Sequence, residues 1–391
     1  MTSTSPAGVP ARGTRPRNRR DLIISAATEL FTSNGYPNVS MSDIAEAVNA
    51  QPSALYRHFS GKHEILREAI SRGARLRLEA LALGEPTGLD EVLADLARSA
   101  LETRRSSLLW TSEVRNLDDE AGAQLRREYR ALPEAFAEKL RSVCEELDAE
   151  HSLVLAWAAL DILASIAFHA ERLPNRKFQS VLCEAMRRVV LLELPPGGVA
   201  EPPSPPSDRG LRREAILRAA ATLFSRRGYS GVTLDDIGVA VGMAGASLYN
   251  YFPGKQSLVA ALMIRSVEWQ EYAASRAVRG VDDPRDRLQA LVSAFVEFTF
   301  EEPALVSLLL TEMSHLPDDV ATSVGQAVTD SVSEWVDLVR TLAPERVLAL
   351  VRVQVQAARM IALDVLGTAS LRGTPGLVRL VTAACCATLD I

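Results

Sequence analysis

Apolar residues recur along this chain at the three- and four-residue spacing of one helix face. Such a stripe runs from Ile23 to Phe31 and is closed by Gly35, and no segment keeps the two-residue alternation of a strand. The pattern therefore predicts an all-α protein. In the first half we expect helices over 20–34, 41–48, 52–58, 62–83, 89–104, 106–116, 118–147, 150–171 and 177–193. In the second half we expect them over 208–227, 234–241, 245–251, 254–279, 284–300, 303–315, 317–341, 344–370 and 375–389.

The stretch from Ser40 to Lys62 is predicted to form two short helices separated by a tight turn. Ser40 is an N-cap, Asn49 tolerates the positive φ that the turn requires, and Pro52 suits the first turn of the second helix. This arrangement is typical of a helix-turn-helix, whose second helix can enter the major groove of DNA. The alternative is that the aromatic residues of the second helix are only a packed core seam.

The same stretch occurs a second time, offset by 193 residues and without a gap. Thr233–Lys255 repeats Ser40–Lys62, with Gly242 at the position of Asn49. Because the register holds over so many residues, we interpret the chain as carrying a duplicated domain.

Both copies share a longer motif that ends one helix, begins the next and closes the turn. The first copy contributes Leu30, Phe31, Gly35, Tyr36, Ser40, Asp43, Ile44, Ala45, Leu55, Tyr56, His58, Phe59 and Lys62. The second contributes Leu223, Phe224, Gly228, Tyr229, Thr233, Asp236, Ile237, Leu248, Tyr249, Phe252 and Lys255. In these residues each copy resembles the DNA-binding part of TetR-family transcriptional regulators. The resemblance implies an all-α fold of two tandem domains, each a helix-turn-helix unit followed by a helical bundle for ligand binding and dimerisation.

The duplication and a proline-rich segment divide the chain into six regions. We expect a disordered basic N-terminal arm over 1–18, a first helix-turn-helix domain over 19–70, a first regulatory bundle over 71–194, a linker over 195–207, a second helix-turn-helix domain over 208–263 and a second bundle over 264–391. The arm is either a solvated tail or a segment that orders on DNA phosphates. The linker, at roughly 3 Å per residue, is long enough to serve two half-sites about 34 Å apart.

The outer faces of the two predicted recognition helices differ. The predicted DNA contacts of the first half are Ser40, Gln51, Ser53, Ala54, Tyr56, Arg57, His58 and Lys62. Those of the second half are Thr233, Ala244, Gly245, Ser247, Tyr249, Asn250, Tyr251 and Lys255. Gln51 can pair with adenine and Arg57 with guanine, whereas the second half offers mostly small side chains. We therefore expect a non-palindromic operator.

Lys62 and Lys255 begin long helices, where a positive charge opposes the helix dipole. We therefore interpret each lysine as a phosphate contact rather than as a structural residue.

Isolated acidic residues stand in otherwise apolar helices of both bundles, and such groups need a partner or a pocket. The predicted ligand-binding residues are Trp110, Glu113, Trp157, Asp161 and Phe168 in the first half, with Phe298, Leu309, Glu312, Met360 and Asp364 in the second. The alternative is ordinary core with internal salt bridges, such as one between Glu113 and Arg115. Similarity in layout to double-domain TetR members linked to lipid and steroid metabolism implies an acyl-CoA, steroid-related or other apolar effector.

TetR-like proteins ordinarily dimerise through their last two helices, and here both sets lie in one chain of 391 residues. We therefore expect an intrachain pseudo-dimer in which 150–193 packs on 344–389, through Leu153, Leu160, Leu163 and Val190 on one side and Leu350, Val353, Ala357 and Leu380 on the other. The competing arrangement is a homodimer of two whole chains.

Composition narrows the function classes. The net charge of −6 is unlike that of a uniformly basic DNA-coating protein, so DNA must meet local basic patches. The 4 cysteines lack metal-ligand spacing and are interpreted as reduced cytosolic thiols. We found no apolar run of about twenty residues without charge, which argues against membrane insertion and favours a cytoplasmic protein.

Three classes of function remain in competition. A DNA-binding transcriptional regulator released by a small-molecule effector is favoured, because both halves keep the helix-turn-helix motif. An enzyme is disfavoured, because the sequence shows no nucleophile-base set, phosphate loop or metal cluster, and no cofactor is expected. A ligand-binding or protein-interaction module with a degenerate second DNA-binding unit is the third class.

Overall fold

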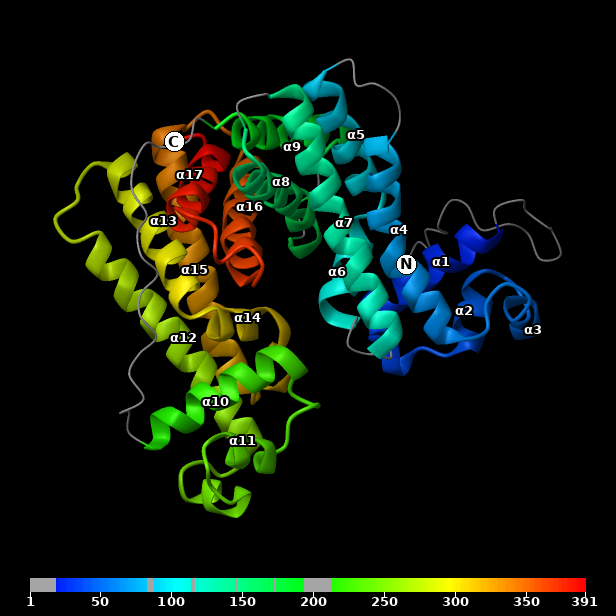
Figure 1. Ribbon diagram of the computed structural model, residues 1–391, viewed down its shortest axis with the longest axis horizontal. Helices are drawn as coiled ribbons and strands as arrows, with labels where there is room; N and C mark the ends of the chain where they lie inside the picture. Colours follow the sequence, from blue (N-terminus) through cyan, green and yellow to red (C-terminus); the bar gives the residue numbers. More distant parts are fainter. Residues whose placement is uncertain are drawn as a thin grey trace, which may run out of the picture. The chain divides into compact units, whose positions relative to one another are not determined.

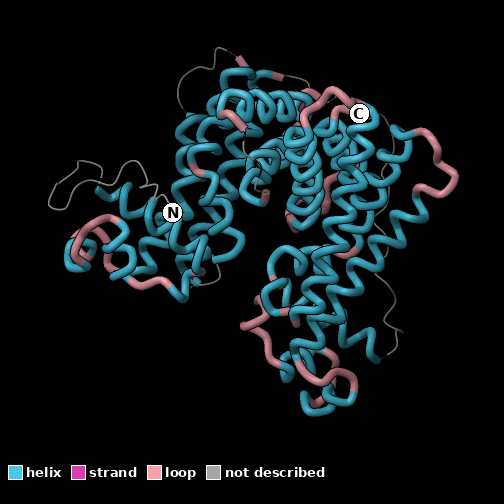
Figure 2. The backbone as a smooth tube through the Cα atoms, turned by 180° about the vertical axis from the view of Figure 1, so that it is seen from behind, coloured by secondary structure: helices cyan, strands magenta, loops and turns pink. Residues whose placement is uncertain are grey.

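The computed structural model describes residues 19–82, 88–113, 117, 119–144, 147–169, 171, 173–192 and 212–391. These residues form helices joined by turns, and no strand occurs among them (Figure 1, Figure 2). The expected all-α fold is confirmed. The predicted arm over 1–18 and the predicted linker over 195–207 lie outside the described residues.

The described residues fall into two compact units. The first unit comprises Met1–Glu145 with Ile166–Phe168, and the second comprises Glu146–Ser165 with His169–Ile391. The first unit contains α1 (Arg19–Asn34), η1 (Tyr36–Asn38), α2 (Met41–Ala47), α3 (Pro52–Leu55), α4 (Lys62–Ala82), α5 (Leu89–Glu102), α6 (Arg104–Glu113), α7 (Asp119–Val143) and η3 (Ile166–Phe168).

The second unit holds the last helices of the first half together with the whole second half. Its helices are α8 (Ala149–Ser165), α9 (Asn175–Val190), α10 (Arg212–Arg227), α11 (Leu234–Ala240), η4 (Gly245–Asn250), α12 (Lys255–Ala277), α13 (Pro284–Glu301), α14 (Pro303–Thr311), η5 (Met313–His315), α15 (Asp318–Leu342), α16 (Leu348–Gly367) and α17 (Leu377–Leu389).

Each helix-turn-helix is held by a small apolar core. In the first, Ile23, Phe31, Ile44 and Leu55 are fully or almost fully buried together. The second repeats this core with residues at the same offset, and in both the long helix α4 or α12 supplies further buried side chains. The apolar stripe seen in the sequence is thus the inner face of each unit.

The recognition helices are shorter than expected. α3 ends at Leu55 rather than at His58, and the second counterpart is the 3₁₀ helix η4. The N–H groups of His58 and Phe59 both bond to the Leu55 carbonyl, at 2.9 and 3.0 Å. This tightened turn carries the Phe59 ring into the core, where it is 2% exposed, at the cost of regular α geometry.

Helices from the two halves of the sequence pack against each other within the second unit (Figure 1). α8 lies along α16, and α9 lies along α17. The buried residues of these helices include Leu163 and Val190 from the first half, with Val353, Ala357 and Leu380 from the second. Because these side chains are apolar, the contact has the composition of a core and not of a surface.

Polar contacts also join these segments. Arg352 Nη1 lies 3.2 Å from Glu171 Oε1, and Arg188 Nε lies 3.5 Å from Asp390 Oδ1. The four side chains keep some solvent exposure, so the ion pairs add orientation more than stability.

One described segment has the length and hydropathy of a membrane span. It is Ala149–Phe168, with a mean hydropathy of 1.7, but 67% of its most apolar window is buried inside the protein. Glu150 and Asp161 interrupt it. These features are those of a buried core helix.

Candidate nucleic-acid interface

A reciprocal capping box begins the first helix of each helix-turn-helix. Ser40 Oγ accepts from the Asp43 N–H at 3.2 Å, and the Ser40 N–H donates to Asp43 Oδ2 at 2.7 Å. Thr233 and Asp236 make the same pair of bonds at 3.1 and 2.8 Å. Hydrogen bonds from the Ser40 backbone and hydroxyl lower the pKa of Asp43, and those from the Thr233 hydroxyl and backbone lower the pKa of Asp236 to about 2.

The capping hydroxyls have a further partner. Ser40 Oγ donates to Asp43 Oδ2 at 2.7 Å, and Thr233 Oγ1 donates to Asp236 Oδ2 at 2.6 Å. A hydroxyl has one proton, so neither group has a donor free for the predicted phosphate contact. The structure gives Ser40 and Thr233 a capping role, and their DNA contacts stay predictions.

Lys62 and Lys255 brace the turn that precedes α2 and α11. Lys62 Nζ donates to the carbonyls of Tyr36 and Val39 at 2.8 and 2.7 Å, and lies 4.1 Å from the centre of the Tyr36 ring. Lys255 makes the corresponding contacts at 2.8, 2.9 and 4.1 Å. Each lysine therefore has a structural role, and its phosphate contact stays a prediction. Two carbonyls and a ring offset the unfavourable helix dipole, which the sequence argument left out.

An arginine on the first helix of each unit was missed as a site residue. The guanidinium of Arg20 lies 4.4 Å from the centre of the Phe59 ring, and its Nη1 donates to the His58 carbonyl at 2.7 Å. Arg213 lies 4.6 Å from the centre of the Phe252 ring. The sequence pattern places Arg20 at the start of the first helix without a role, although the same offset of 193 residues links it to Arg213. Both arginines put positive charge beside a recognition helix.

The first recognition helix presents a polar outer face. Gln51, Ser53 and Arg57 are exposed, and the Tyr56 side chain is 57% exposed. Ala54 and His58 are half-buried. Asn49 has the expected positive φ, of 50°. The structure thus brings most of the predicted first-half contacts onto one accessible surface.

The second recognition helix sits closer to the helix before it. Gly245 is buried, and a Cβ built on it would lie 1.9 Å from Asp235 Oδ1. A Cβ on Gly238 would lie 2.7 Å from the Met243 carbonyl oxygen. Only glycine fits at these two close approaches. Gly245 therefore packs α11 against η4, and its DNA contact stays a prediction.

The remaining second-half candidates are accessible. Tyr249 and Tyr251 are 59% and 38% exposed, Ala244 and Asn250 are exposed, and Ser247 is half-buried. The exposed carboxylate Asp235 also lies at the start of this face. The second surface therefore offers fewer hydrogen-bond donors than the first, with an acid beside them.

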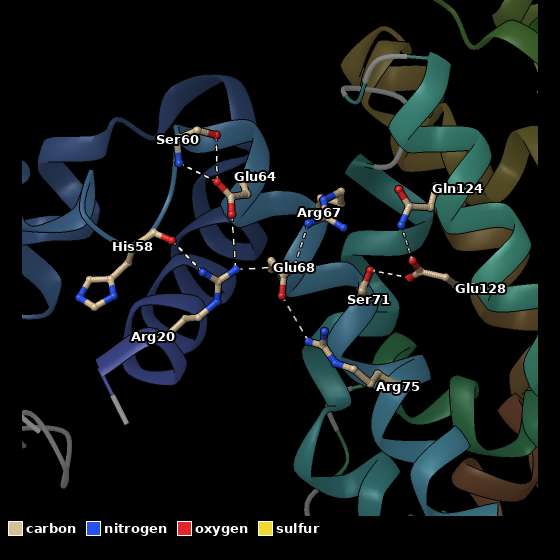
Figure 3. Close-up of polar contacts among 10 residues, drawn as sticks. All are labelled: Arg20, His58, Ser60, Glu64, Arg67, Glu68, Ser71, Arg75, Gln124 and Glu128. Carbon is tan, nitrogen blue, oxygen red and sulfur yellow. Dashed lines mark hydrogen bonds and ion pairs between the residues drawn. The ribbon is translucent and has the colours of Figure 1, made fainter. Parts of the chain in front are cut away.

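A polar network links the first recognition helix to α4 (Figure 3). Glu64 Oε2 accepts from the Ser60 N–H at 2.6 Å, and its Oε1 lies 3.4 Å from Arg20 Nη2. One turn later, Glu68 accepts from Arg67 at 2.8 Å and from Arg75 at 3.3 Å. The hydrogen bond from the Ser60 backbone N–H lowers the pKa of Glu64.

Farther along α4, a separate set of hydrogen bonds joins this helix to α7. Ser71 Oγ donates to Glu128 Oε2 at 2.8 Å, and Gln124 Nε2 donates to Glu128 Oε1 at 3.0 Å (Figure 3). In the second half, Ser257 and Ala261 occupy the positions of Glu64 and Glu68. The acidic part of the network is therefore a property of the first half.

Four predicted ligand residues pack between a bundle helix and a helix-turn-helix instead. Trp110 stacks on Tyr129 with ring centres 3.9 Å apart and packs against the first helix-turn-helix core. Burial, followed by the nearby charge of Glu113, raises the pKa of Tyr36. Leu309 packs against the core of the second helix-turn-helix. These residues pack in the described structure, and their ligand contacts stay predictions.

Glu312 shows this role most directly. It is 1% exposed, its Oε2 accepts from the Tyr229 N–H at 3.3 Å, and the same oxygen lies 3.5 Å from His315 Nε2. The His315 ring stacks on the Tyr229 ring at 4.3 Å. This contact between Glu312 and His315 is an internal polar contact of the kind expected under the alternative, whereas Arg115 lies outside the described residues.

A hollow of about 320 Å³ lies between α12, α13 and α15 of the second bundle. Its lining includes Gln270, Asp330 and the ion pair of Arg287 with Glu334 at 3.2 Å. A smaller adjoining hollow is lined by aromatic residues, among them the predicted ligand residue Phe298. The half-buried Trp157 and Phe168 and the buried Met360 line neither hollow.

Asp161 and Asp364 meet where α8 packs on α16. Burial, followed by the charge of Asp364, raises the pKa of Asp161 well above its usual value. Asp364 keeps solvent exposure although protein atoms crowd its carboxyl group and raise its pKa. Because water reaches Asp364, we assign the neutral, hydrogen-bond-donating form to Asp161. This pair lies in the contact between α8 and α16 and lines neither hollow, and its ligand contact stays a prediction.

No group of three or more possible metal ligands occurs among the described residues. Two kinds of domain in this chain match known protein families. Residues 23–69 and 216–262 each match the family described as bacterial regulatory proteins, tetR family. Residues 281–369 match the tetracyclin repressor-like C-terminal domain.

Individual proteins match between 30% and 40% of the chain. The HTH-type transcriptional activator FasR of Mycolicibacterium smegmatis is 30% identical over 158 residues, which is 39% of this chain and 72% of FasR. The HTH-type transcriptional regulator TcmR of Streptomyces glaucescens is 29% identical over 40% of this chain and 66% of its own length. The repressor KstR2 of M. smegmatis is 28% identical over 30% of this chain and 57% of its own.

Solved structures match in the same way. A TetR-family regulator from Bordetella parapertussis covers 46% of this chain and 94% of its own, at 22% identity and a TM-score of 0.42. The ketosteroid regulator KstR2 of Mycobacterium tuberculosis covers 41% of this chain and 85% of its own, at 23% identity and a TM-score of 0.38.

Proposed function

The chain belongs to the tetR family of bacterial regulatory proteins, whose members are DNA-binding transcriptional regulators and not enzymes, and on that premise we propose that it is a ligand-released repressor with two unlike DNA-binding units. One observation carries the proposal. Both helix-turn-helix units keep the same capping box, the same lysine brace and the same arginine over a phenylalanine, while their outer faces differ. Each scaffold is therefore intact, and the two surfaces suit different DNA sequences.

The proposed active form is an intrachain pseudo-dimer acting in the cytoplasm. The packing of α8 on α16 and of α9 on α17 supports it, because TetR-like proteins use the corresponding helices to dimerise. The competing form is a homodimer of whole chains. The proposal keeps the six domains predicted from the sequence, and the matched segments 23–69 and 216–262 fall inside the two helix-turn-helix domains.

The proposed operator is double-stranded DNA without a palindrome. A symmetric dimer presents identical side chains to both half-sites, whereas this chain presents Gln51 and Arg57 on one side and Ala244 and Asn250 on the other. The first surface should read bases by paired hydrogen bonds. The second should contribute fewer specific contacts and rely more on the phosphate backbone.

The proposed effector is a bulky apolar molecule of the acyl-CoA or steroid-related class. Support comes from the hollow of about 320 Å³ in the second bundle and from a layout that resembles the mycobacterial double-domain repressor of the third mammalian-cell-entry operon. Binding in a bundle would move α4 or α12, and each of these helices begins at the lysine that braces its helix-turn-helix. The effector must bind the two arrangements of the unit with different affinities to release DNA.

Gel-shift titration of the whole chain with the DNA upstream of its own coding region tests the proposal. We expect binding that saturating acyl-CoA or steroid probes weaken, and a light-scattering mass of one chain at low concentration. Failure of every probe to change operator affinity would remove the ligand-released part. A mass of two chains that persists on dilution would favour the homodimer.

A second candidate function is a ligand-binding or protein-interaction module whose second DNA-binding unit is degenerate. The buried Gly245 and the acidic Asp235 on the second surface favour it. Under this alternative, a footprint covers one half-site, and Asn250→Ala leaves operator affinity unchanged.

A further inference from the structure

Arg77 is a buried cation inside the first bundle. It lies on α4, and the residue is 5% exposed. Its Nε and Nη2 atoms have no hydrogen-bond partner, and no ion pair joins it to a carboxylate among the described residues. Burial lowers the pKa of this guanidinium, yet arginine stays charged at neutral pH. A charge kept out of water in this way is costly unless an anion accompanies it.

The two unsatisfied nitrogens lie on one edge of the guanidinium plane. Nε and Nη2 each point an N–H in the same direction, because Nη2 is the terminal nitrogen on the side of the Nε hydrogen. That edge is the one that binds a carboxylate or phosphate through two parallel hydrogen bonds. The donors of Arg77 are therefore arranged for an oxyanion and not for a single carbonyl.

Two groups on α7, Glu128 and Tyr129, do not supply that oxyanion. Glu128 is held by Ser71 and Gln124 at 2.8 and 3.0 Å. Burial raises the pKa of Tyr129 to about 12, so its hydroxyl is neutral at physiological pH. Tyr129 Oη lies 3.5 Å from the Ile70 carbonyl, its own hydrogen-bond acceptor.

Gly73 lies one turn before Arg77 on α4 and faces Nη1 of the guanidinium, on the side away from the Nε and Nη2 edge. A Cβ built on Gly73 would stand 3.6 Å from Arg77 Nη1, 3.6 Å from Thr103 Oγ1 and 3.4 Å from Ser106 Cβ. These are ordinary contact distances, so a group as large as a methyl fits there without displacing its neighbours. Thr103 and Ser106 add polar side chains to the same place.

In the second half, the residues at the positions of Gly73 and Arg77 form a hydrogen bond with each other. The offset of 193 residues carries Gly73 to Ser266 and Arg77 to Gln270. Gln270 lines the hollow of the second bundle, and its Nε2 donates to Ser266 Oγ at 3.2 Å. The position of Arg77 therefore faces the ligand-accessible interior in the duplicate. In the first bundle a glycine replaces the serine, and a charged donor replaces the amide.

We propose that the first bundle binds the carboxylate or phosphate group of an amphipathic ligand through Nε and Nη2 of Arg77. This inference rests on the proposed ligand-responsive function and narrows it: Arg77 lets the first bundle select an anionic head group, whereas the equivalent position of the second bundle holds the uncharged Gln270. The two bundles would then respond to different ligands.

Calorimetric titration of the whole chain with octanoate, octyl phosphate and octan-1-ol tests the inference. We expect octanoate or octyl phosphate to bind, and the neutral alcohol to bind at least about tenfold more weakly, because it cannot accept two charged hydrogen bonds. Which anion binds more tightly identifies the carboxylate or phosphate class. Equal affinity for octan-1-ol, or binding of neither anion, overturns the inference.

Three variants complete the test. Arg77→Met removes the charge and should abolish anion binding without lowering the melting temperature, because it also removes the isolated buried charge. Gly73→Ser copies the second bundle and should weaken anion binding about tenfold or more while Arg77 remains. Gln270→Met is the matched control and should leave the anion affinity unchanged. Unchanged anion binding in both Arg77→Met and Gly73→Ser contradicts the site.

Operator binding measured on the same samples distinguishes failure of the anion site from failure of the proposed function. If the wild-type chain binds operator DNA and an apolar effector releases it, but no anion binds, the anion site fails and the proposed function stands. If anions bind through Arg77 and the chain binds no DNA, the proposed function fails and the anion site stands.

Discussion

The two helix-turn-helix units differ on their outer surfaces much more than in their scaffolds. Each has a capped first short helix and a lysine bound to two carbonyls. The first surface carries Arg57 and Gln51, whereas the second carries Asn250 and Ala244 at the same offset. The residues that the two units share stabilise the helix-turn-helix. We expect the residues that differ to determine which DNA sequence each unit binds.

The largest expected effect follows from breaking the shared scaffold. Lys62→Met and Lys255→Met each remove two hydrogen bonds from a charged donor, so we expect each to lower the free energy of unfolding of its own unit by about 3 kcal/mol. Thermal denaturation of both variants checks whether the losses are equal. If Lys62→Met leaves stability unchanged and flattens the salt dependence of DNA binding, the lysine is a phosphate contact and the structural assignment is wrong.

The outer surfaces should respond unequally. Arg57→Ala should weaken operator binding by about 1 to 3 kcal/mol, with the loss confined to one half-site, because a base-reading arginine makes paired bonds. Asn250→Ala should cost about 0.5 to 1.5 kcal/mol, as for one neutral hydrogen bond. Fluorescence anisotropy with operators altered in one half-site at a time measures both. Equal losses spread over both half-sites would contradict the division of roles.

The place where the halves meet offers a pH test. In the folded protein the pKa of Asp161 is raised above its unfolded value of about 4. The contribution of Asp161 to stability is therefore fully present below the unfolded pKa. It is lost as the pH rises through the raised folded pKa. Asp161→Asn should therefore be more stable than the wild-type chain at high pH, by about 1 kcal/mol or more, with the difference shrinking toward low pH.

Denaturant unfolding between pH 5 and pH 9 checks this sign. Asp364→Asn is the matched control at the corresponding, solvent-exposed position and should gain less. A stability difference that does not change with pH would show that the Asp161 carboxyl does not titrate in this range.

The smallest expected effect is in the caps. Ser40→Ala and Thr233→Ala each remove one side-chain acceptor from a helix N-terminus, so each should cost about 1 kcal/mol of stability. The two values should agree, because the capping boxes have the same geometry. A clear difference in thermal denaturation would show that one scaffold is under additional strain.

Much of the fold could be predicted from the sequence because it depends on local signals. The helical stripe, the Ser40 and Thr233 caps and the positive φ at Asn49 all follow from short-range chemistry, and the structure contains them. Because the chain is duplicated, each prediction for the first helix-turn-helix also applied to the second. The packing of the last helices of the two halves followed from the resemblance, not from any local pattern.

The site residues were harder to predict because their roles depend on partners distant in the sequence. Lys62 lies 26 residues from the Tyr36 carbonyl that it binds, and Glu312 lies 83 residues from the Tyr229 amide. An isolated acid in an apolar helix indicates that a partner exists, but not whether it is a ligand or a backbone group. Arg77 carried no signal in the sequence, since a lone arginine on a long helix is usually exposed.

The central claim is that one chain reads two different half-sites, and a base-substitution scan across the operator tests it most directly. With the wild-type chain, every base pair is replaced in turn and the change in binding free energy is measured. We predict an asymmetric profile, with the larger penalties in the half-site that Arg57→Ala relaxes. A perfect inverted repeat with equal penalties in both halves would contradict the claim.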